Sequence, residues 1–332
     1  MFQPQEISRE EWDEVSQGSP QLNLLQSWAY GAAKEQSSAW RVERGYFQDN
    51  GSTLGIAQCL VRSLPLGLGG VAWVNRGPMV VSSGSAHSCD QLAAALRAYY
   101  VSVRGYYLRI APPVPEEAFN AADWREAGFE TADTLGWASA VLDLSPPLEE
   151  LRARLNRKWR GHLNRAGRKS IDLKVGDEEQ HFDVFLRQHE SLIAEKGFET
   201  SVTPAFLRAL QDALPKSRKM LVVLAYHENE LLGSVLMAFY GDTAEYLAGN
   251  TTDQGRRLGA GHLMLWRAIE AVQERGYRYL DVSGMDPIQT PEGILTFKQG
   301  LNAEPYRFSN NLYAGVGGPI TWALHRFVSR AL

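Results

Sequence analysis

The segment that decides the fold covers residues 244–300 and reads AEYLAGNTTDQGRRLGAGHLMLWRAIEAVQERGYRYLDVSGMDPIQTPEGILTFKQG. Its pattern predicts a strand at 244–250, a glycine-containing loop at 255–261, a helix that ends at 275–276, and a second strand at 279–283. Free N–H groups and the helix dipole favour an anion at a helix N-terminus, and glycines let the backbone approach that anion closely. The order of elements therefore predicts a phosphate site at Arg256, Gly259 and Gly261.

The first half of the chain repeats the pattern of the second half. Strands are predicted at 40–47, 53–62, 71–81 and 106–111 in the first half, and at 219–227, 232–240, 244–249 and 279–283 in the second. A helix at 89–104 ends on Arg104-Gly105-Tyr106, as the later helix ends on Arg275-Gly276-Tyr277. Gly55 and Gly233 each follow a predicted hairpin turn. We interpret the chain as two copies of one α/β domain.

Composition excludes several classes of protein. The chain has 332 residues, 44% hydrophobic and 22% charged, with a net charge of −4, which is typical of a soluble globular protein and gives no general attraction to nucleic acid. Two distant cysteines, Cys59 and Cys89, predict neither a disulfide framework nor a zinc site, and the histidines form no metal-binding motif. Without a signal-peptide pattern at the N-terminus, we expect a cytoplasmic protein that holds no metal.

A strongly basic segment separates the two halves. Residues 151–171 contain no acidic residue, and their cations are Arg152, Arg154, Arg157, Lys158, Arg160, Arg165, Arg168 and Lys169. Apolar residues at helical spacing, from Leu148 to Ala166, predict a single helix over 146–169 that packs on one face and exposes its basic face. Two interpretations remain open: a solvated surface, or a site for a phosphate-bearing ligand. A further amphipathic helix is predicted at 320–332, where packing on a domain and contact with the inner membrane face are the alternatives.

Several motifs, taken together, resemble known families. The sequence from Arg256 to Gly261 fits the R/Q-x-x-G-x-G/A loop of the GNAT N-acetyltransferases. The wider pattern resembles the FemABX peptidoglycan bridge aminoacyltransferases. It comprises the segment 25–28 followed by Lys34, the basic segment 158–169, the Tyr246-Leu247-x-Gly249 motif, and Gly284-x-Asp286-Pro287 with Phe297-Lys298-x-Gly300. The chain has no coiled-coil insertion and is similar to the shorter members of that family.

The resemblance implies an α/β (α+β) fold of two tandem GNAT-like domains, each a mixed, mainly antiparallel sheet flanked by helices. We expect the first domain at 1–145, with 313–332 returning to it, and the second at 146–312, including the basic helix. The family transfers an amino acid from aminoacyl-tRNA to the stem-peptide amine of a UDP-MurNAc-pentapeptide or of lipid II. No cofactor is implied, because aminoacyl-tRNA is a donor substrate, and a monomer is expected.

The resemblance also assigns roles to individual residues. Lys298, expected on a strand, would stabilise the negative charge that develops on the ester carbonyl. Lys34, with Arg165 or Arg168, would bind the pyrophosphate of the precursor. Tyr246 would line the peptide channel. For Asp286-Pro287 we expect a turn rather than a catalytic acid.

One position departs from the family pattern and leaves alternatives open. The family usually has an aspartate before a proline after the first-domain strand, whereas this chain has Ala111 before Pro112. Either that carboxylate is dispensable or the acceptor differs. The glycine loop also leaves open an N-acyltransferase that binds the pyrophosphate of acyl-CoA at Gly259, Ala260 and Gly261. A third possibility is a non-catalytic duplicate that binds nucleotide-linked glycans or RNA through the basic helix.

Overall fold

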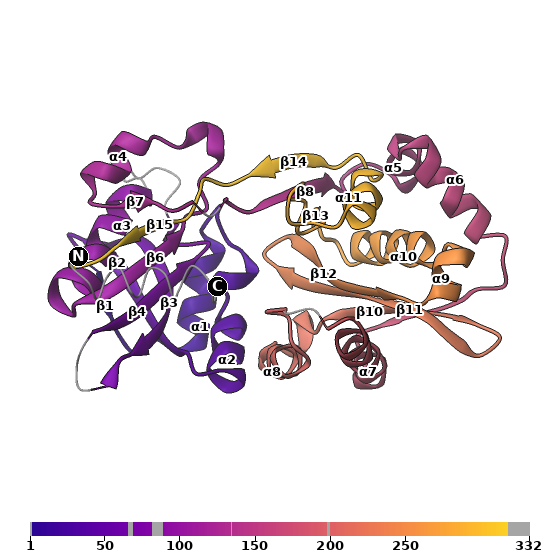
Figure 1. Cartoon of the computed structure of the whole chain (residues 1–332), viewed down its shortest axis with the longest axis horizontal. Coiled ribbons are helices and arrows are strands. Elements are labelled where there is room, and N and C mark those ends of the chain that lie inside the picture. Colours follow the sequence, from indigo (N-terminus) through magenta and orange to yellow (C-terminus); the bar gives the residue numbers. More distant parts are fainter. Residues whose placement is uncertain (1, 66–68, 82–88, 134, 198–199, 318–332) are drawn as a thin grey trace. The chain divides into compact units, whose positions relative to one another are not determined.

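The structure is a computed structural model, and it describes residues 2–65, 69–81, 89–133, 135–197 and 200–317. These residues form two compact units (Figure 1). The first domain comprises the described residues up to Trp137 and from Arg307 on, and the second comprises Ala138–Tyr306. The predicted helix at 320–332 lies outside the described residues. Among the residues described, no helix is long and apolar enough to span a membrane.

The first domain is built on a sheet with the strand order β1-β2-β3-β4-β6-β15-β7, and the short strand β5 pairs with β3. Its strands are β1 (Phe2–Pro4), β2 (Arg41–Asp49), β3 (Ser52–Ser63), β4 (Gly70–Asn75), β5 (Met79–Val80), β6 (Tyr106–Ala111), β7 (Glu130–Thr131) and β15 (Leu312–Ala314). The strands β4 and β6 are parallel and pair over six residues, from Gly70 with Tyr106 to Asn75 with Ala111. The strand predicted at 71–81, with a bulge-like Gly77-Pro78, is divided into β4 and β5, because Arg76 between them adopts a left-handed conformation.

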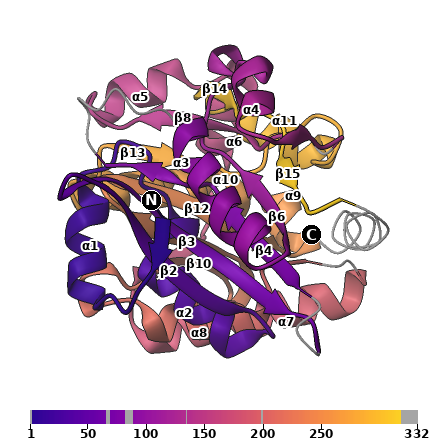
Figure 2. The ribbon, with the colours of Figure 1, turned by 90° about the vertical axis from the view of Figure 1, so that its left-hand side faces the viewer.

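Helices cover both faces of the first sheet (Figure 2). The helix α3 (Cys89–Arg97) continues into a π-helical turn, η3 (Ala98–Val103), which confirms the predicted helix at 89–104. It buries Leu92, Leu96 and Tyr100 against one face. On the other side, α1 (Arg9–Gln17) buries Trp12 against Ile56, and α2 (Trp28–Ser37) precedes β2. The helix α4 (Ala121–Glu126) precedes β7.

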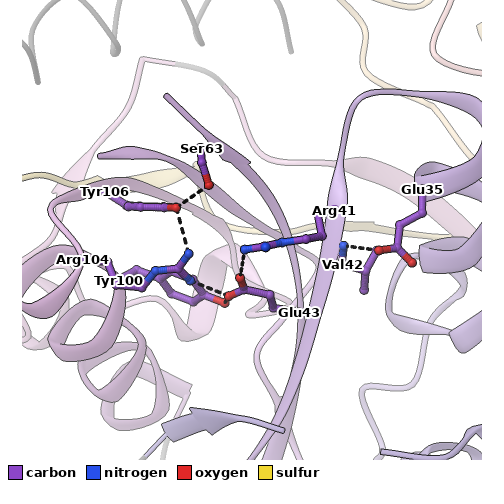
Figure 3. A network of polar contacts seen from close by, with 8 residues as sticks. All are labelled: Glu35, Arg41, Val42, Glu43, Ser63, Tyr100, Arg104 and Tyr106. Carbon is purple, nitrogen blue, oxygen red and sulfur yellow. Dashed lines mark hydrogen bonds and ion pairs between the residues drawn. The ribbon is translucent and has the colours of Figure 1, made fainter. Parts of the chain in front are cut away.

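A network of polar contacts links β2 of the first domain to the end of η3 (Figure 3). The Glu43 carboxylate accepts hydrogen bonds from Arg104 at 2.7 Å and from the Tyr100 hydroxyl at 2.9 Å, and its other oxygen pairs with Arg41 at 2.6 Å. Arg104 also donates to the Tyr106 hydroxyl at 2.8 Å. Each partly buried charge in this network therefore has an opposite charge in direct contact, as burial requires.

The second domain is built on a sheet with the order β14-β8-β13-β12-β11-β10-β9. Its strands are β8 (Ala138–Asp143), β9 (Asp172–Gly176), β10 (Leu221–His227), β11 (Glu230–Tyr240), β12 (Thr243–Thr251), β13 (Tyr279–Asp281) and β14 (Glu304–Arg307). The helix α10 (Ala260–Glu274) packs on one face of this sheet, with Met264 and Ile269 in the core. The helix α7 (Glu179–Lys196) contacts β9 to β12, and α8 (Pro204–Ala213) packs against α7 (Figure 1).

The basic segment forms two helices, so the prediction of a single helix over 146–169 is wrong. The helix α5 (Leu148–Arg154) ends where Leu155 becomes extended. The helix α6 (Arg157–Ala166) begins after Asn156, whose side chain caps its N-terminus. The predicted apolar face is confirmed, because Leu151, Trp159 and Leu163 are buried in the core that contains α10.

One strand of the first sheet comes from the part of the chain that follows the second domain. The strand β15 pairs with β6 of the first domain, and β8 pairs with β13 of the second. Residues 138–143, which we expected in the first domain, thus belong to the second sheet, because their main-chain hydrogen bonds are made there. The units divide at 137/138 and 306/307 rather than at the expected 145/146 and 312/313.

The repeated glycines occupy equivalent positions in the two sheets. Gly55 of β3 lies opposite Phe47, and Gly233 of β11 lies opposite Ala225, and in both hairpins the register shifts at that pair. A Cβ atom on Gly55 would lie 2.5 Å from Leu92 of α3, and one on Gly233 would lie 2.8 Å from Met264 of α10. In both domains the glycine therefore lets the helix approach the sheet.

Candidate active site

The site begins where two parallel strands stop pairing. The strands β12 and β13 pair from Thr243 with Tyr279 to Glu245 with Asp281, and the ladder ends at these two acids. Both carboxylates are only 3% exposed. Burying two acids at the end of a parallel pair is costly without strong partners. The two buried acids therefore need polar partners at the end of the ladder, which makes this position a candidate site.

Ser283 connects the two carboxylates. Its main-chain N–H donates to Asp281 at 2.8 Å, and its hydroxyl donates to Glu245 at 2.7 Å. Asp281 also accepts hydrogen bonds from the Ser139 hydroxyl and, at 2.6 Å, from the Tyr306 hydroxyl. Ser283 has a φ of 56°, in the left-handed region that residues other than glycine seldom adopt.

Lys298 reaches this cluster from the helix α11 (Glu292–Gln299), so the prediction that it lies on a strand is wrong. Its Nζ donates to the main-chain carbonyls of Ser283 at 2.7 Å and Gly284 at 3.1 Å, and the residue is 7% exposed. Burial lowers the pKa of Lys298 to about 8, and the nearby Asp281 and Glu245 oppose that shift. Lys298 is therefore mostly an ammonium at neutral pH, although little water surrounds it.

The structure brings Tyr246 and Lys298 together, although the sequence separates them widely. The Lys298 Nζ lies 5.4 Å from the centre of the Tyr246 ring, within range of a cation–π interaction. Burial raises the pKa of Tyr246 to about 12. A Cβ atom on Gly249 would lie 2.0 Å from the Tyr246 hydroxyl, so the glycine of the Tyr246-Leu247-x-Gly249 motif leaves room for the ring.

The Phe297-Lys298-x-Gly300 motif also has a steric explanation. The Trp159 indole N–H donates to the Phe297 carbonyl at 3.0 Å. A Cβ atom on Gly300 would lie 2.3 Å from the Trp159 ring. Phe297 and Gly300 thus fasten α11 to α6, and this packing fixes the direction from which Lys298 enters the site.

The predicted phosphate loop is packed against other side chains. Residues 253–258 form the short helix α9 (Asp253–Leu258), and Gly259 joins it to α10 with a φ of 79°. His262, in the first turn of α10, contacts the rings of His162 at 4.8 Å, Trp159 at 4.9 Å and Phe297 at 5.0 Å. Burial, together with His162 and Arg165, lowers the pKa of His262 to about 4. Arg256 pairs with Asp253. The helix α6 therefore packs at the N-terminus of α10.

The remaining predicted binding residues lie on both domains. Lys34 is in α2 of the first domain, partly buried, with its Nζ 5.4 Å from the Tyr30 ring, and burial lowers its pKa. Arg165 lies in α6 and contacts His162 at 3.1 Å. Arg168 follows α6 and lines a groove of about 490 Å³ with Arg152 and Arg267. The proposed pairing of Lys34 with Arg165 or Arg168 stays a prediction.

Two further positions can be placed. Asp286 accepts hydrogen bonds from the main-chain N–H groups of Ile288 and Gln289, which confirms the expected turn. Ala111 ends β6, opposite Asn75. Within the described part of the chain, no group of three or more His, Cys, Asp or Glu side chains could hold a metal ion.

The sequence did not point to Glu245, Asp281, Ser283 or Tyr306. A signal was present, because each acid stands between apolar neighbours in a short buried strand, where an acid is rare. That signal identifies a buried charge, but not its partner. The partner is known only when α11 is placed beside the end of the β12–β13 ladder.

The comparisons with known proteins agree with this geometry. Residues 7–135 match the model of the FemAB family, and residues 150–298 match that of the acetyltransferase (GNAT) domain. The crystal structure of FemX is similar with a TM-score of 0.80 and 16% identity, covering 98% of this chain and 99% of FemX. The two family-model matches and the similar fold together support a tandem GNAT protein of the FemABX type. The chain is an acyltransferase, and the predicted fold of two GNAT-like domains is confirmed.

Other similar structures extend the comparison. A tandem GNAT protein from the clavulanic acid biosynthesis pathway has a TM-score of 0.58 and 15% identity, covering 96% of this chain and 99% of that protein. The structure of L-PGS from Bacillus licheniformis has a TM-score of 0.52 and 12% identity, covering 88% of this chain and 89% of its own. No curated protein matches the chain. At these identities the similar structures establish the fold alone.

Proposed function

We propose that the protein transfers an amino acid from aminoacyl-tRNA to the stem-peptide amine of a UDP- or lipid-linked peptidoglycan precursor. The observation that carries this proposal is the buried ammonium of Lys298 at the end of the β12–β13 ladder, beside Tyr246. A fixed cation in a poorly hydrated site stabilises a developing oxyanion much better than water does. The FemAB match of the first domain supports the choice of reaction.

The proposed reaction uses the acceptor amine, the donor ester, water and Lys298. The neutral amine of the acceptor attacks the ester carbonyl of the donor, and Lys298 donates a hydrogen bond to the oxyanion that forms. An amide bond forms, the ester C–O bond breaks, and the proton lost by the amine reaches the leaving ribose hydroxyl through water. Two N–H groups of Lys298 are bound by Ser283 and Gly284, so the third is the one that would meet the oxyanion.

Acceptor binding is assigned to Lys34, Arg165, Arg168 and Tyr246. Phosphate groups favour Arg and Lys partners, because charge-assisted hydrogen bonds to them are strong. Arg168 lines the groove beside α6, and Tyr246 lies next to Lys298, where the stem-peptide amine has to arrive. The chemistry of the acceptor thus agrees with the residues available.

The surface formed by α5 and α6 supports an RNA donor. Of the eight cations in 151–171, only Arg154 forms an ion pair with a carboxylate within the described residues, that of Glu150. Arg157, Lys158 and Lys169 are exposed. Clustered exposed cations without carboxylate partners favour a polyphosphate backbone. This local excess of positive charge lies in a protein whose net charge is −4.

The second candidate is an N-acyltransferase that uses acyl-CoA, which the GNAT domain match favours. Against it, Trp159, His162 and Phe297 surround His262 at the N-terminus of α10, where the pyrophosphate of CoA would have to bind. A bulky anion there would have to displace these side chains. For this reason aminoacyl-tRNA is the preferred donor.

The test uses the full chain with total tRNA charged with a mixture of amino acids, and either UDP-MurNAc-pentapeptide or lipid II as the acceptor. Mass spectrometry should show the acceptor gaining one aminoacyl residue, and ribonuclease treatment of the donor should abolish the gain. Parallel reactions contain acetyl-CoA or a longer acyl-CoA in place of tRNA. Consumption of acyl-CoA alone would contradict the proposal. Binding of the precursor without turnover from any donor would favour a binding role.

A further inference from the structure

Ser283 adopts an unusual conformation for which its neighbours provide the reason. With a φ of 56°, a residue that carries a Cβ is strained unless several contacts hold it. Two contacts do so: its N–H is bound by Asp281 and its hydroxyl by Glu245. Both acids are buried, and they lie on adjacent strands at the last pair of the ladder. The carbonyl of Ser283, fixed in this way, accepts from Lys298 at 2.7 Å.

We propose that Ser283 is a positioning residue of the transfer reaction, held in its left-handed conformation by Asp281 and Glu245 so that its main-chain carbonyl fixes the ammonium of Lys298. This inference rests on the proposed role of Lys298 in transfer. The serine side chain touches neither lysine nor substrate in this scheme. It acts by directing the Ser283–Gly284 carbonyls.

The geometry explains why the lysine is held by carbonyls rather than by an acid. Within the described residues, Lys298 forms no ion pair with a carboxylate, and its two acceptors are the carbonyls of Ser283 and Gly284. A direct ion pair would satisfy the ammonium and weaken its attraction for an oxyanion. Carbonyl acceptors leave the charge available, while the two acids behind Ser283 favour the protonated form from a greater distance.

The titratable groups around Lys298 come from several elements. Glu245 and Tyr246 lie on β12, Asp281 on β13 and Tyr306 on β14. Asp286 follows Gly284 in the turn after β13, and His262 of α10 lies beyond Phe297. Of these groups, Asp281 and Glu245 are the two that raise the pKa of Lys298 against the effect of burial. Neutralising either acid should therefore lower that pKa.

The experiment measures Lys298 directly as well as the reaction. Protein labelled with 13C at the lysine Cε is titrated by NMR, and the Lys298 resonance is assigned as the one missing from Lys298→Met. Glu245→Gln and Asp281→Asn keep the size of each side chain and remove its charge. We expect both variants to titrate at lower pH than the wild type, and the alkaline limb of kcat to move in the same direction. Glu150→Gln, the same change on the exposed side of α5, should leave both unchanged.

Two serine variants separate the hydroxyl from the backbone conformation. Ser283→Ala loses the link to Glu245 and keeps the strained φ, whereas Ser283→Gly loses the link and accepts that φ without strain. Both should lower kcat, by roughly tenfold for the alanine variant, with little change in KM for either substrate. Each variant is compared with the wild type in its melting temperature, so that unfolding is recognised.

The outcomes distinguish this proposal from the proposed function. The positioning role would be wrong if Lys298 kept its wild-type pKa in both acid variants and kcat stayed at the wild-type value in both serine variants. That result would not contradict aminoacyl transfer. Displaced titration in a protein that transfers no amino acid would support the carboxylate part and would refute the proposed substrates. Because the NMR titration needs no substrate, the two failures cannot be confused.

Discussion

The two domains share one topology and differ where their central parallel strands end. In the first domain β4 and β6 pair over six residues, and the ladder ends with the apolar Ala111 opposite Asn75. In the second domain the corresponding strands β12 and β13 pair over three residues and stop at Glu245 and Asp281. The shorter β12–β13 ladder leaves main-chain groups without strand partners at its end, beside two buried acids. The shorter ladder is therefore the structural difference that places the proposed site in the second domain.

The two domains also hold a cation in different ways, partly buried Arg104 in the first and buried Lys298 in the second. In the first domain Arg104 contacts the Glu43 carboxylate directly, at 2.7 Å, and the charges neutralise each other. In the second domain Lys298 is bound by two carbonyls, and its nearby acids bind Ser283 instead. A neutralised cation stabilises a fold, whereas a cation held by carbonyls can still attract a charged transition state. This contrast can be tested by removing each cation.

The largest effect is expected from Lys298→Met. Losing the only proposed oxyanion donor should lower kcat by roughly 10²–10³-fold with little change in KM for either substrate. The matched variant Arg104→Met should keep kcat and lose stability, by about 2 kcal/mol, because Glu43 and Tyr106 lose a charged partner. Steady-state kinetics and chemical denaturation measure the two effects. A fall in kcat for Arg104→Met, with Lys298→Met unaffected, would reverse the assignment of the two domains.

The next effect tests whether the domains are otherwise equivalent. Gly55→Ala and Gly233→Ala each place a Cβ against a main-chain carbonyl, 2.6 Å from that of Met79 and 2.5 Å from that of Asn250 respectively. We expect each substitution to lower the free energy of unfolding by about 2 kcal/mol. Gly293→Ala is the control, because its Cβ would meet no atom within 4 Å and it lies inside α11. It should be neutral or stabilising by up to about 1 kcal/mol. Unequal costs for Gly55 and Gly233 would argue against equivalent packing.

The duplication of the domain could be predicted from the sequence, because the signals for turns and helix ends are local. Gly105 and Gly276 both end a helix with positive φ, and this need is visible in the sequence. The place of β8 in the second sheet was not predicted, because a six-residue strand does not reveal which sheet it completes. The strand β15, by contrast, overlaps the segment 313–332 that we expected to return to the first domain. Lys298 was a candidate from the sequence but was placed on a strand, because β-branched Ile294 and Thr296 and aromatic Phe297 precede it. Its partner Ser283 depends on backbone conformation, and no composition rule predicts that a serine adopts φ of 56°.

A smaller effect should come from the basic surface, which distinguishes α6 from the acidic α1 of the first domain. Arg157→Ala combined with Lys158→Ala should raise KM for aminoacyl-tRNA about tenfold and weaken its dependence on salt, with kcat preserved. Arg9→Ala is the control on α1, where the arginine pairs with Asp13 at 3.4 Å. The measurement is the initial rate at several tRNA and salt concentrations. If KM and its salt dependence stayed unchanged, Arg157 and Lys158 would be part of a solvated surface only.

The smallest expected effect is a loss of stability at low pH, and it should appear in the second domain only. The folded-state pKa of His262 is about 4, below the ordinary 6.5, because the residue is buried near His162 and Arg165. The unfolded chain therefore binds more protons between pH 6.5 and 4, so this contribution to stability is complete above pH 6.5 and is lost as the pH falls toward 4. Hydrogen exchange should show the protection factors of α10 falling relative to those of α3 between pH 7 and 5. His262→Phe keeps a ring in contact with Trp159 and Phe297 and should abolish the difference. Equal loss of protection in α3 and α10 would mean that the acid sensitivity does not arise at this histidine.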